Sequence, residues 1–479
     1  MRNNIIRFGL LTAAISISSV SKAAIELPDI VSDNMVLQQQ SDARLWGWAT
    51  PGSVITVKPS WTGARAVKTR TADNGRWDVA VATPEASFTP YTLSIKGDGS
   101  DITLDNVLVG EVWFCSGQSN MEMPVKGYNM QPVDGSARAV AESRRYPGIR
   151  MANVPHAQSY TPQDRVGGKW ETSEPANVWD FSAMAYYFAR ELTDQLNVPV
   201  GIIHSSYGGS KVEGWEPREL LETYPDCDID KEAADPEFNH MHRINTKYNA
   251  MLHPLIGYTI KGFVWNQGES NVGQHDTYPE RQRDMVTYWR DKWGQGELPF
   301  YFVEIPGWIY SDANGTEAAL FRECQHRAAE ITPNSALIYS PDLVYPDGMY
   351  CIHSPKKDQL GSRMAYLVAE RTYGIEGLPT RFPTFKSMTV DGNKASLLFD
   401  NAPTGFYPFN DLKGFEVAGD DGVFHPANAW GNGNTLGIDI SCPDVETIRE
   451  VRYNFKNFAP ATVFNAQGLP LVPFRTDKD

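Results

Sequence analysis

Side chains that could perform acyl transfer follow four apolar runs of the sequence. In chain order they are Ser116 and Ser119 after residues 107–114, Gly208 and Gly209 after 198–204, Gln267 and Glu269 after 260–265, and Asp342, Asp347 and His353 after 336–340. Ester hydrolysis through a hydroxyl nucleophile needs a base, a group that orients the base, and N–H donors for the oxyanion. The ordered set, more than any single member, indicates a serine hydrolase.

Two serines compete for the role of nucleophile in the stretch Ser-Gly-Gln-Ser-Asn. Ser119 is followed by Asn120 and Met121, so it does not lie in a Gly-x-Ser-x-Gly motif. The strained strand-to-helix turn of the α/β-hydrolases is therefore not indicated. Ser116 remains the alternative to Ser119.

The elements that must position these residues alternate between strands and helices. Apolar runs at 107–114, 198–204, 260–265, 300–305 and 336–340 predict strands. Helical periodicity predicts helices over 181–196, 279–293, 317–331 and 356–373, the last opened by Ser354 as N-cap and Pro355 in the first turn. This alternation predicts a parallel sheet covered by helices on both faces, with the site at the carboxyl ends of the strands.

The chain of 479 residues is long enough for two or three domains. Residues 24–105 contain short alternating runs separated by Gly, Pro, Asn and Asp, which predict a β-sandwich-like N-terminal domain. We expect the catalytic domain over 106–375. Residues 376–479 become β-like again and predict a C-terminal β-domain.

The first 23 residues have the pattern of a secretion signal. Arg2 and Arg7 precede a short apolar stretch, and small residues lead to Ala23, where we expect cleavage. No Cys lies near this site, which argues against a lipoprotein anchor, and no later run is long enough to span a membrane. A secreted or periplasmic protein is expected.

Charge and cysteine content exclude several other classes. The formal net charge is −15, and it becomes −15 − 3 = −18 once the expected leader, with three positive charges and no acid, is removed, so neither nucleic acid nor an anionic membrane is an expected partner. Five widely spaced Cys form no metal-binding knuckle and no dense disulfide framework, although one or two disulfides remain open. A zinc site at His240 and His242, with Asp235, is a weak alternative because its spacing matches no known ligand pattern.

Four stretches resemble the sialate O-acetylesterase family: "WFCSGQSNMEMPV", "VPVGIIHSSYGGSKVEGW", "IKGFVWNQGESN" and "VRYNF…GLPLVPFRTD". The resemblance runs from about residue 28 to 477. That family belongs to the SGNH-hydrolase superfamily of carbohydrate esterases, and it includes enzymes acting on sialic acids and on plant glycans. The resemblance implies a flavodoxin-like three-layer α/β/α core with flanking β-domains, and O-acetylated sugars as substrates, with neither metal nor cofactor.

The resemblance also assigns roles to individual residues. Ser119 is the expected nucleophile and His353 the expected base. The expected oxyanion hole consists of the N–H groups of Ser119 and of Gly208 or Gly209, with the side-chain amide of Gln267. Asn120 and Glu269 are expected immediately behind these residues.

The acid that orients His353 departs from the superfamily pattern, which places it two or three residues before the His. Those positions hold Cys351 and Tyr350 here, and the nearest upstream acid is Asp347. Asp347 is the first candidate and Asp342 the second. The third possibility is a Ser–His dyad, in which a backbone carbonyl or Glu269 holds His353. The alternative function is that of a non-catalytic carbohydrate-binding protein.

The substrate is left open between an anionic and a neutral sugar. An anionic sialic acid calls for a cation, and an acetylated plant glycan for aromatic side chains. The candidates are Lys126, Lys211, Arg218 and Arg243 for the first case, and Trp215, Trp308 and Tyr310 for the second. The oligomeric state is also left open.

Overall fold

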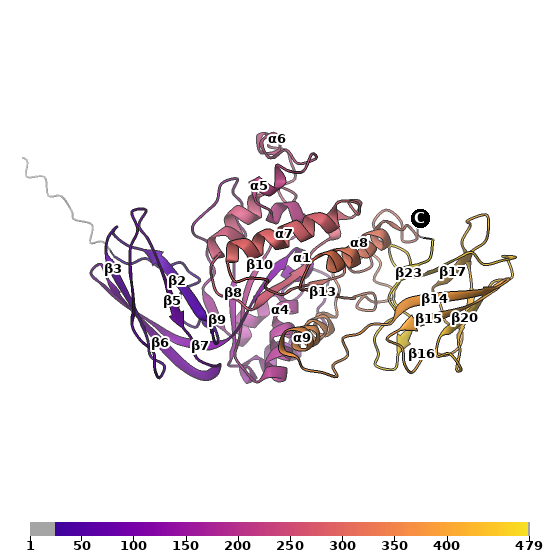
Figure 1. The fold of residues 1–479 in the computed structure, drawn as a ribbon, viewed down its shortest axis with the longest axis horizontal. Coiled ribbons are helices and arrows are strands. Elements are labelled where there is room, and N and C mark those ends of the chain that lie inside the picture. Colours follow the sequence, from indigo (N-terminus) through magenta and orange to yellow (C-terminus); the bar gives the residue numbers. More distant parts are fainter. Residues whose placement is uncertain (1–23, 478–479) are drawn as a thin grey trace, which may run out of the picture.

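The computed structural model describes residues 24–477, so the predicted leader, residues 1–23, lies outside the described residues. Figure 1 shows three parts in a row: an N-terminal β-region, a central α/β core and a C-terminal β-region. None of the described helices is both long and apolar enough to cross a membrane.

The N-terminal region is built from antiparallel strands and one long strand that continues into the core. Its strands are β1 (Val36–Gln38), β2 (Asp42–Trp48), β3 (Val54–Pro59), β4 (Val67–Arg70), β5 (Arg76–Ala82), β6 (Ser87–Gly97) and β7 (Ser100–Gly117). β2 pairs with β5, while β3, β4, β6 and the first half of β7 form a second layer. β7 therefore spans the predicted domain boundary at 105/106 and is shared by the two regions.

The core sheet has the order β13-β12-β11-β7-β10-β8-β9. Its further strands are β8 (Ile149–Asn153), β9 (Trp170–Thr172), β10 (Val200–Ser206), β11 (Gly262–Asn266), β12 (Phe300–Val303) and β13 (Ser335–Ile338). All neighbours pair in parallel except β9, which is antiparallel to β8. The expected α/β class is confirmed.

Helices cover both faces of this sheet (Figure 1). The long ones are α4 (Ala183–Leu196), α7 (Tyr278–Trp293), α8 (Glu317–Ile331) and α9 (Lys357–Tyr373); the short ones are α1 (Ser119–Glu122), α2 (Ser136–Glu142), α3 (Pro175–Asp180), α5 (Arg218–Leu221) and α6 (Ile229–Ala234). Successive residues of β7 point to opposite faces: Phe114 packs in the cluster of α7 and α8, and Trp113 in that of α4 and α9. Burial on both faces explains why the second half of β7 is mostly apolar, with Glu111 as a buried exception.

The C-terminal region consists of short antiparallel strands around a separate apolar cluster. These are β14 (Thr384–Asp391), β15 (Lys394–Asp400), β16 (Phe406–Tyr407), β17 (Phe415–Ala418), β18 (His425–Pro426), β19 (Asn428–Gly431), β20 (Ile438–Ser441), β21 (Glu450–Tyr453), β22 (Phe464–Asn465) and β23 (Phe474–Arg475). Asn457 links this region to the core, because its Oδ1 accepts a hydrogen bond from the N–H of Ala318 at the start of α8 (2.8 Å).

Two details differ from the sequence-based expectations. The sheet has an additional edge, β8 and β9, whose short strands the apolar-run criterion did not detect. Ser354 does not cap α9: its hydroxyl donates to the carbonyl of Leu343, and the helix starts after Lys356. All five Cys are unpaired thiols.

Candidate active site

The carboxyl ends of three parallel strands meet at Gly117. This residue lies beside Ser206 of β10 and Asn266 of β11 in the sheet register. Its φ is +139°, and a Cβ there would lie 2.1 Å from the Asn266 carbonyl oxygen, so only glycine fits. The chain then turns into α1, which begins with the half-buried Ser119. The apolar strand runs into small polar residues because the predicted nucleophile stands at its end.

His353 is held in a defined orientation by an amide. Its Nδ1 is hydrogen-bonded to the Oε1 of Gln131, and its Nε2 is buried without a hydrogen-bond partner. Because a carbonyl oxygen only accepts, Nδ1 carries the proton and Nε2 keeps its lone pair. The ring of Tyr128 packs edge-on against the imidazole with centroids 5.1 Å apart. The unpartnered Nε2 is what a general base requires.

The backbone on both sides of His353 is attached to the residue after Ser119. The Nδ2 of Asn120 donates to the carbonyl of Ile352 (3.0 Å), and the N–H of Ser354 donates to the Oδ1 of Asn120 (3.3 Å). These two bonds tie the segment that carries the predicted base to the helix that carries the predicted nucleophile.

A buried network lies beneath Asn120. The Nζ of Lys357 donates to the Asn120 carbonyl (2.9 Å) and Oδ1 (2.6 Å), while Asn120 Nδ2 also donates to the Oε1 of Glu269 (2.5 Å). Burial lowers the pKa of Lys357 to about 7 and raises that of Glu269. Burial, and secondly the charge of Lys357, lower the pKa of His353 to about 4. Asn120 and Glu269 thus lie directly behind the site, and Lys357, which sequence reasoning missed, joins them.

Of the expected oxyanion donors, Gly208 lies beside Ser119, whereas the amide of Gln267 is bound to other groups. Within the described chain no backbone acceptor takes the N–H of Gly208 or Gly209, and a Cβ on Gly208 would lie 3.6 Å from the Cβ of Ser119. Gly208 is therefore adjacent to the nucleophile. Gln267 is fully buried, and its Nε2 already donates to Gln118 Oε1 (3.1 Å), the Ser210 carbonyl (3.0 Å) and Asn271 Oδ1 (2.7 Å). The amide of Gln267 is therefore engaged in hydrogen bonds behind the site and is not directed at the expected oxyanion position.

Neither candidate acid is brought to His353. Asp347 is exposed on the loop before Cys351, and the partner on His353 Nδ1 is Gln131 instead. Asp342 pairs with the guanidinium of Arg363 through both oxygens (2.7 and 2.5 Å). Gln131 was missed because it lies 222 residues before His353 and is an amide, not an acid.

The other predicted groups are spread around the core. In the described residues no three His, Cys, Asp or Glu side chains gather into a group that could hold a metal, including those near His240 and His242. Trp215 is buried in the core against Trp265. Trp308 and Tyr310 pack on each other, half-buried, with centroids 4.9 Å apart.

The four candidate cations differ in their surroundings. Lys126 pairs with Asp180, and Arg218 pairs with Glu222 and Asp230. Arg243 lies over the Tyr160 ring, whereas Lys211 lines a cavity of about 400 Å³.

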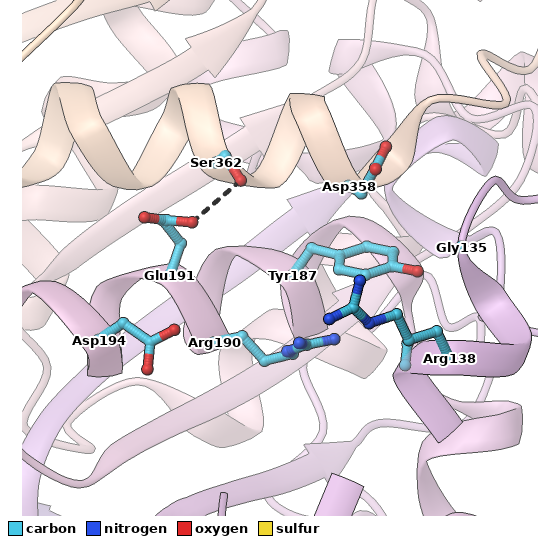
Figure 2. Close-up of a pocket in the computed structure, with 9 residues that line it drawn as sticks. Gly135, Arg138, Tyr187, Arg190, Glu191, Asp194, Asp358 and Ser362 are labelled. Carbon is cyan, nitrogen blue, oxygen red and sulfur yellow. Dashed lines mark hydrogen bonds between the residues drawn. The ribbon is translucent and has the colours of Figure 1, made fainter. Parts of the chain in front are cut away.

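A cavity of about 310 Å³ lies between α4 and α9, outside this constellation. Figure 2 shows the side chains of the two helices facing each other across it, with Ser362 donating to Glu191 (3.2 Å). None of its lining residues belongs to the predicted site, so it is not the catalytic centre.

The fold is a parallel sheet covered by helices on both faces, and the predicted site residues Ser119, Gly208 and His353 lie at the carboxyl ends of its strands. Residues 109–370, more than half of the chain, match the family described as carbohydrate esterase, sialic acid-specific acetylesterase. The chain belongs to this family, and it is a carbohydrate acetylesterase similar to the sialate O-acetylesterases.

Individual relatives agree with this assignment. The chain is 27% identical to human sialate O-acetylesterase over 77% of this chain and 75% of the relative, and 25% identical to the mouse protein over 86% and 85%. The crystal structure of a carbohydrate acetylesterase from Xanthomonas citri superposes with a TM-score of 0.83 at 31% identity, covering 95% of this chain and all of that one. This similarity confirms the fold.

Proposed function

We propose that the protein removes acetyl groups from sugar hydroxyls through an acyl-enzyme on Ser119. The observation that carries the proposal is the state of His353: its Nδ1 is held by Gln131 and its Nε2 is buried without a partner, on a segment that is hydrogen-bonded to Asn120 of α1. Ser119 and Nε2 share no hydrogen bond in the described structure. Catalytic hydrogen bonds of this kind often form only when substrate binds.

In the proposed reaction, Ser119 Oγ attacks the acetyl carbonyl carbon and its proton moves to His353 Nε2. The N–H groups of Ser119 and Gly208 stabilise the oxyanion. The carbon–oxygen bond to the sugar then breaks, and the sugar oxygen takes the proton from Nε2. A water molecule, deprotonated by the same nitrogen, attacks the acetyl-enzyme; acetate leaves and Ser119 regains its proton. Gln131 keeps the imidazole in the required tautomer throughout.

The substrate class within this function is proposed as an O-acetylated sialic acid or an acetylated plant glycan. The human and mouse relatives are sialate O-acetylesterases, which supports the first. Export across the cell membrane belongs to the same proposal and rests on the sequence pattern of residues 1–23.

The test is acetate release by the mature protein and by Ser119→Ala on O-acetylated sialic acid and acetylated xylan side by side. We expect wild type to release acetate from at least one of them and the variant to lose about 10⁴-fold or more in kcat. Full activity in the variant would overturn the assignment of the nucleophile. Sugar binding without acetate release, and without labelling of Ser119 by a phosphonate, would favour a carbohydrate-binding protein instead.

A further inference from the structure

A second ionisable pair, Glu122 and His156, lies beside the nucleophile and has no part in the mechanism above. Glu122 follows Ser119 by three residues in α1, so the two side chains share one face of the helix. A Cβ on Gly208 would lie 3.2 Å from Glu122 Oε2 and 3.6 Å from Ser119 Cβ. The carboxylate, the nucleophile and the expected oxyanion donor therefore border one small space.

His156 holds this carboxylate in its ionised form. Its Nε2 lies 3.2 Å from Glu122 Oε1, and its ring stacks on Tyr207 with centroids 4.3 Å apart. The hydrogen bond to Glu122 raises the pKa of His156. Burial raises the pKa of Glu122, but the hydrogen bond and charge of His156, with smaller contributions from His204 and the N–H of Gly208, make the net shift downward. Each partner thus favours the charged form of the other.

One oxygen of the pair is left for a ligand. Glu122 Oε2 is buried and has no hydrogen-bond partner of good geometry among the described residues. The N–H of Gly208 is nevertheless close enough to help lower the pKa of Glu122. The Glu122 side chain is 25% exposed and that of His156 48%, so solvent reaches the pair. An unpartnered carboxylate oxygen is costly unless a donor arrives.

The carboxylate has no role in orienting His353, because Gln131 occupies Nδ1 of that imidazole. It does not stabilise the oxyanion either, because like charges repel. The carboxylate can instead accept a hydrogen bond from a hydroxyl group. Neighbouring oxygens of a sugar lie about one hydrogen-bond length apart, so a hydroxyl beside the esterified oxygen falls in the space next to Ser119.

We infer that Glu122, held by His156, accepts a hydrogen bond from a free hydroxyl next to the acetylated position of the sugar. This inference rests on the proposed esterase function and adds a selection rule to it. The preferred substrate is a partly acetylated sugar, and esters without a neighbouring hydroxyl are hydrolysed less efficiently. A site built to bind a hydroxyl discriminates strongly against its absence, because its own polar group is then left unpaired.

The test compares kcat/KM on two kinds of ester in wild type and Glu122→Gln. The first is 4-nitrophenyl acetate, which has no hydroxyl; the second is the better substrate of mono-O-acetylated N-acetylneuraminic acid and methyl mono-O-acetyl-xyloside. We expect the ratio of sugar to aryl activity to fall about 10- to 100-fold in the variant, as for loss of one charged hydrogen bond. His156→Gln should lower the same ratio to a smaller extent. The exposed Glu171→Gln should leave it unchanged.

An unchanged ratio in both Glu122→Gln and His156→Gln would overturn the inference, whether or not both activities fell together. That result would assign the pair a structural role and would leave the esterase proposal standing. The esterase proposal itself fails separately, if wild type hydrolyses neither ester or if Ser119→Ala remains active.

Discussion

At the residue scale, Gln131 takes the place that a carboxylate usually has beside a catalytic imidazole. An amide oxygen fixes the tautomer of His353 but adds no negative charge to stabilise an imidazolium. Burial, and secondly the charge of Lys357, lower the pKa of His353 to about 4, and Gln131 supplies no negative charge to oppose that shift. Because the base works when neutral, we expect kcat/KM to hold at acidic pH and to decline only as the pH falls through about 4.

We predict that Gln131→Ala lowers kcat about 10- to 100-fold with little change in KM, which is less than the ~10⁴-fold typical of a lost triad carboxylate. Gln131→Glu should raise the pKa of His353, because a negative charge favours the imidazolium, and should move the acid limb to higher pH. Asp347→Asn is the matched control and should leave the pH profile of 4-nitrophenyl acetate hydrolysis unchanged. A large loss in Asp347→Asn would restore Asp347 as the orienting acid.

At the element scale, the end of β7 depends on Gly117. We predict that Gly117→Ala destabilises the protein by about 3 kcal/mol or more, since both the positive φ and the contact with the Asn266 carbonyl resist a side chain. Gly52→Ala is the control: its φ is +80°, but nothing lies within 4 Å of the added Cβ. Thermal unfolding should show a clearly larger drop for Gly117→Ala; equal drops would contradict the steric argument.

The start of α9 is coupled to α1 through Lys357. We predict that Lys357→Met lowers kcat about 10-fold, because Asn120 loses both hydrogen bonds from Nζ. Lys357 is protonated below its pKa of about 7, so its charge is present where His353 titrates. Removing that charge should raise the pKa of His353 and shift the acid limb of kcat/KM upward. Lys356→Met, whose Nζ instead contacts the Asp342 carbonyl, should not shift it.

At the scale of the whole molecule, the catalytic core is attached to β-regions at both ends, and β7 runs unbroken from the first into the core. The leader pattern predicts that the full chain, expressed in a bacterium with a secretion pathway, yields a mature protein that begins at Ala24. Mass spectrometry of the exported fraction checks this. Recovery of the whole protein in the cytoplasm with residues 1–23 attached would count against export.

The sequence by itself predicted the layered core and singled out Ser119 and His353 as the candidate nucleophile and base. Helical periodicity was enough to predict α8, which spans 317–331 as expected, because the pattern that encodes a helix repeats within that one element. Ser119 and His353 could be singled out because each follows a strand of a parallel sheet, where strand ends converge. Only the tertiary structure decided what surrounds them. Gln131, Lys357 and His156 come from separate loops and helices, and their contacts depend on how those segments pack, which no local pattern encodes.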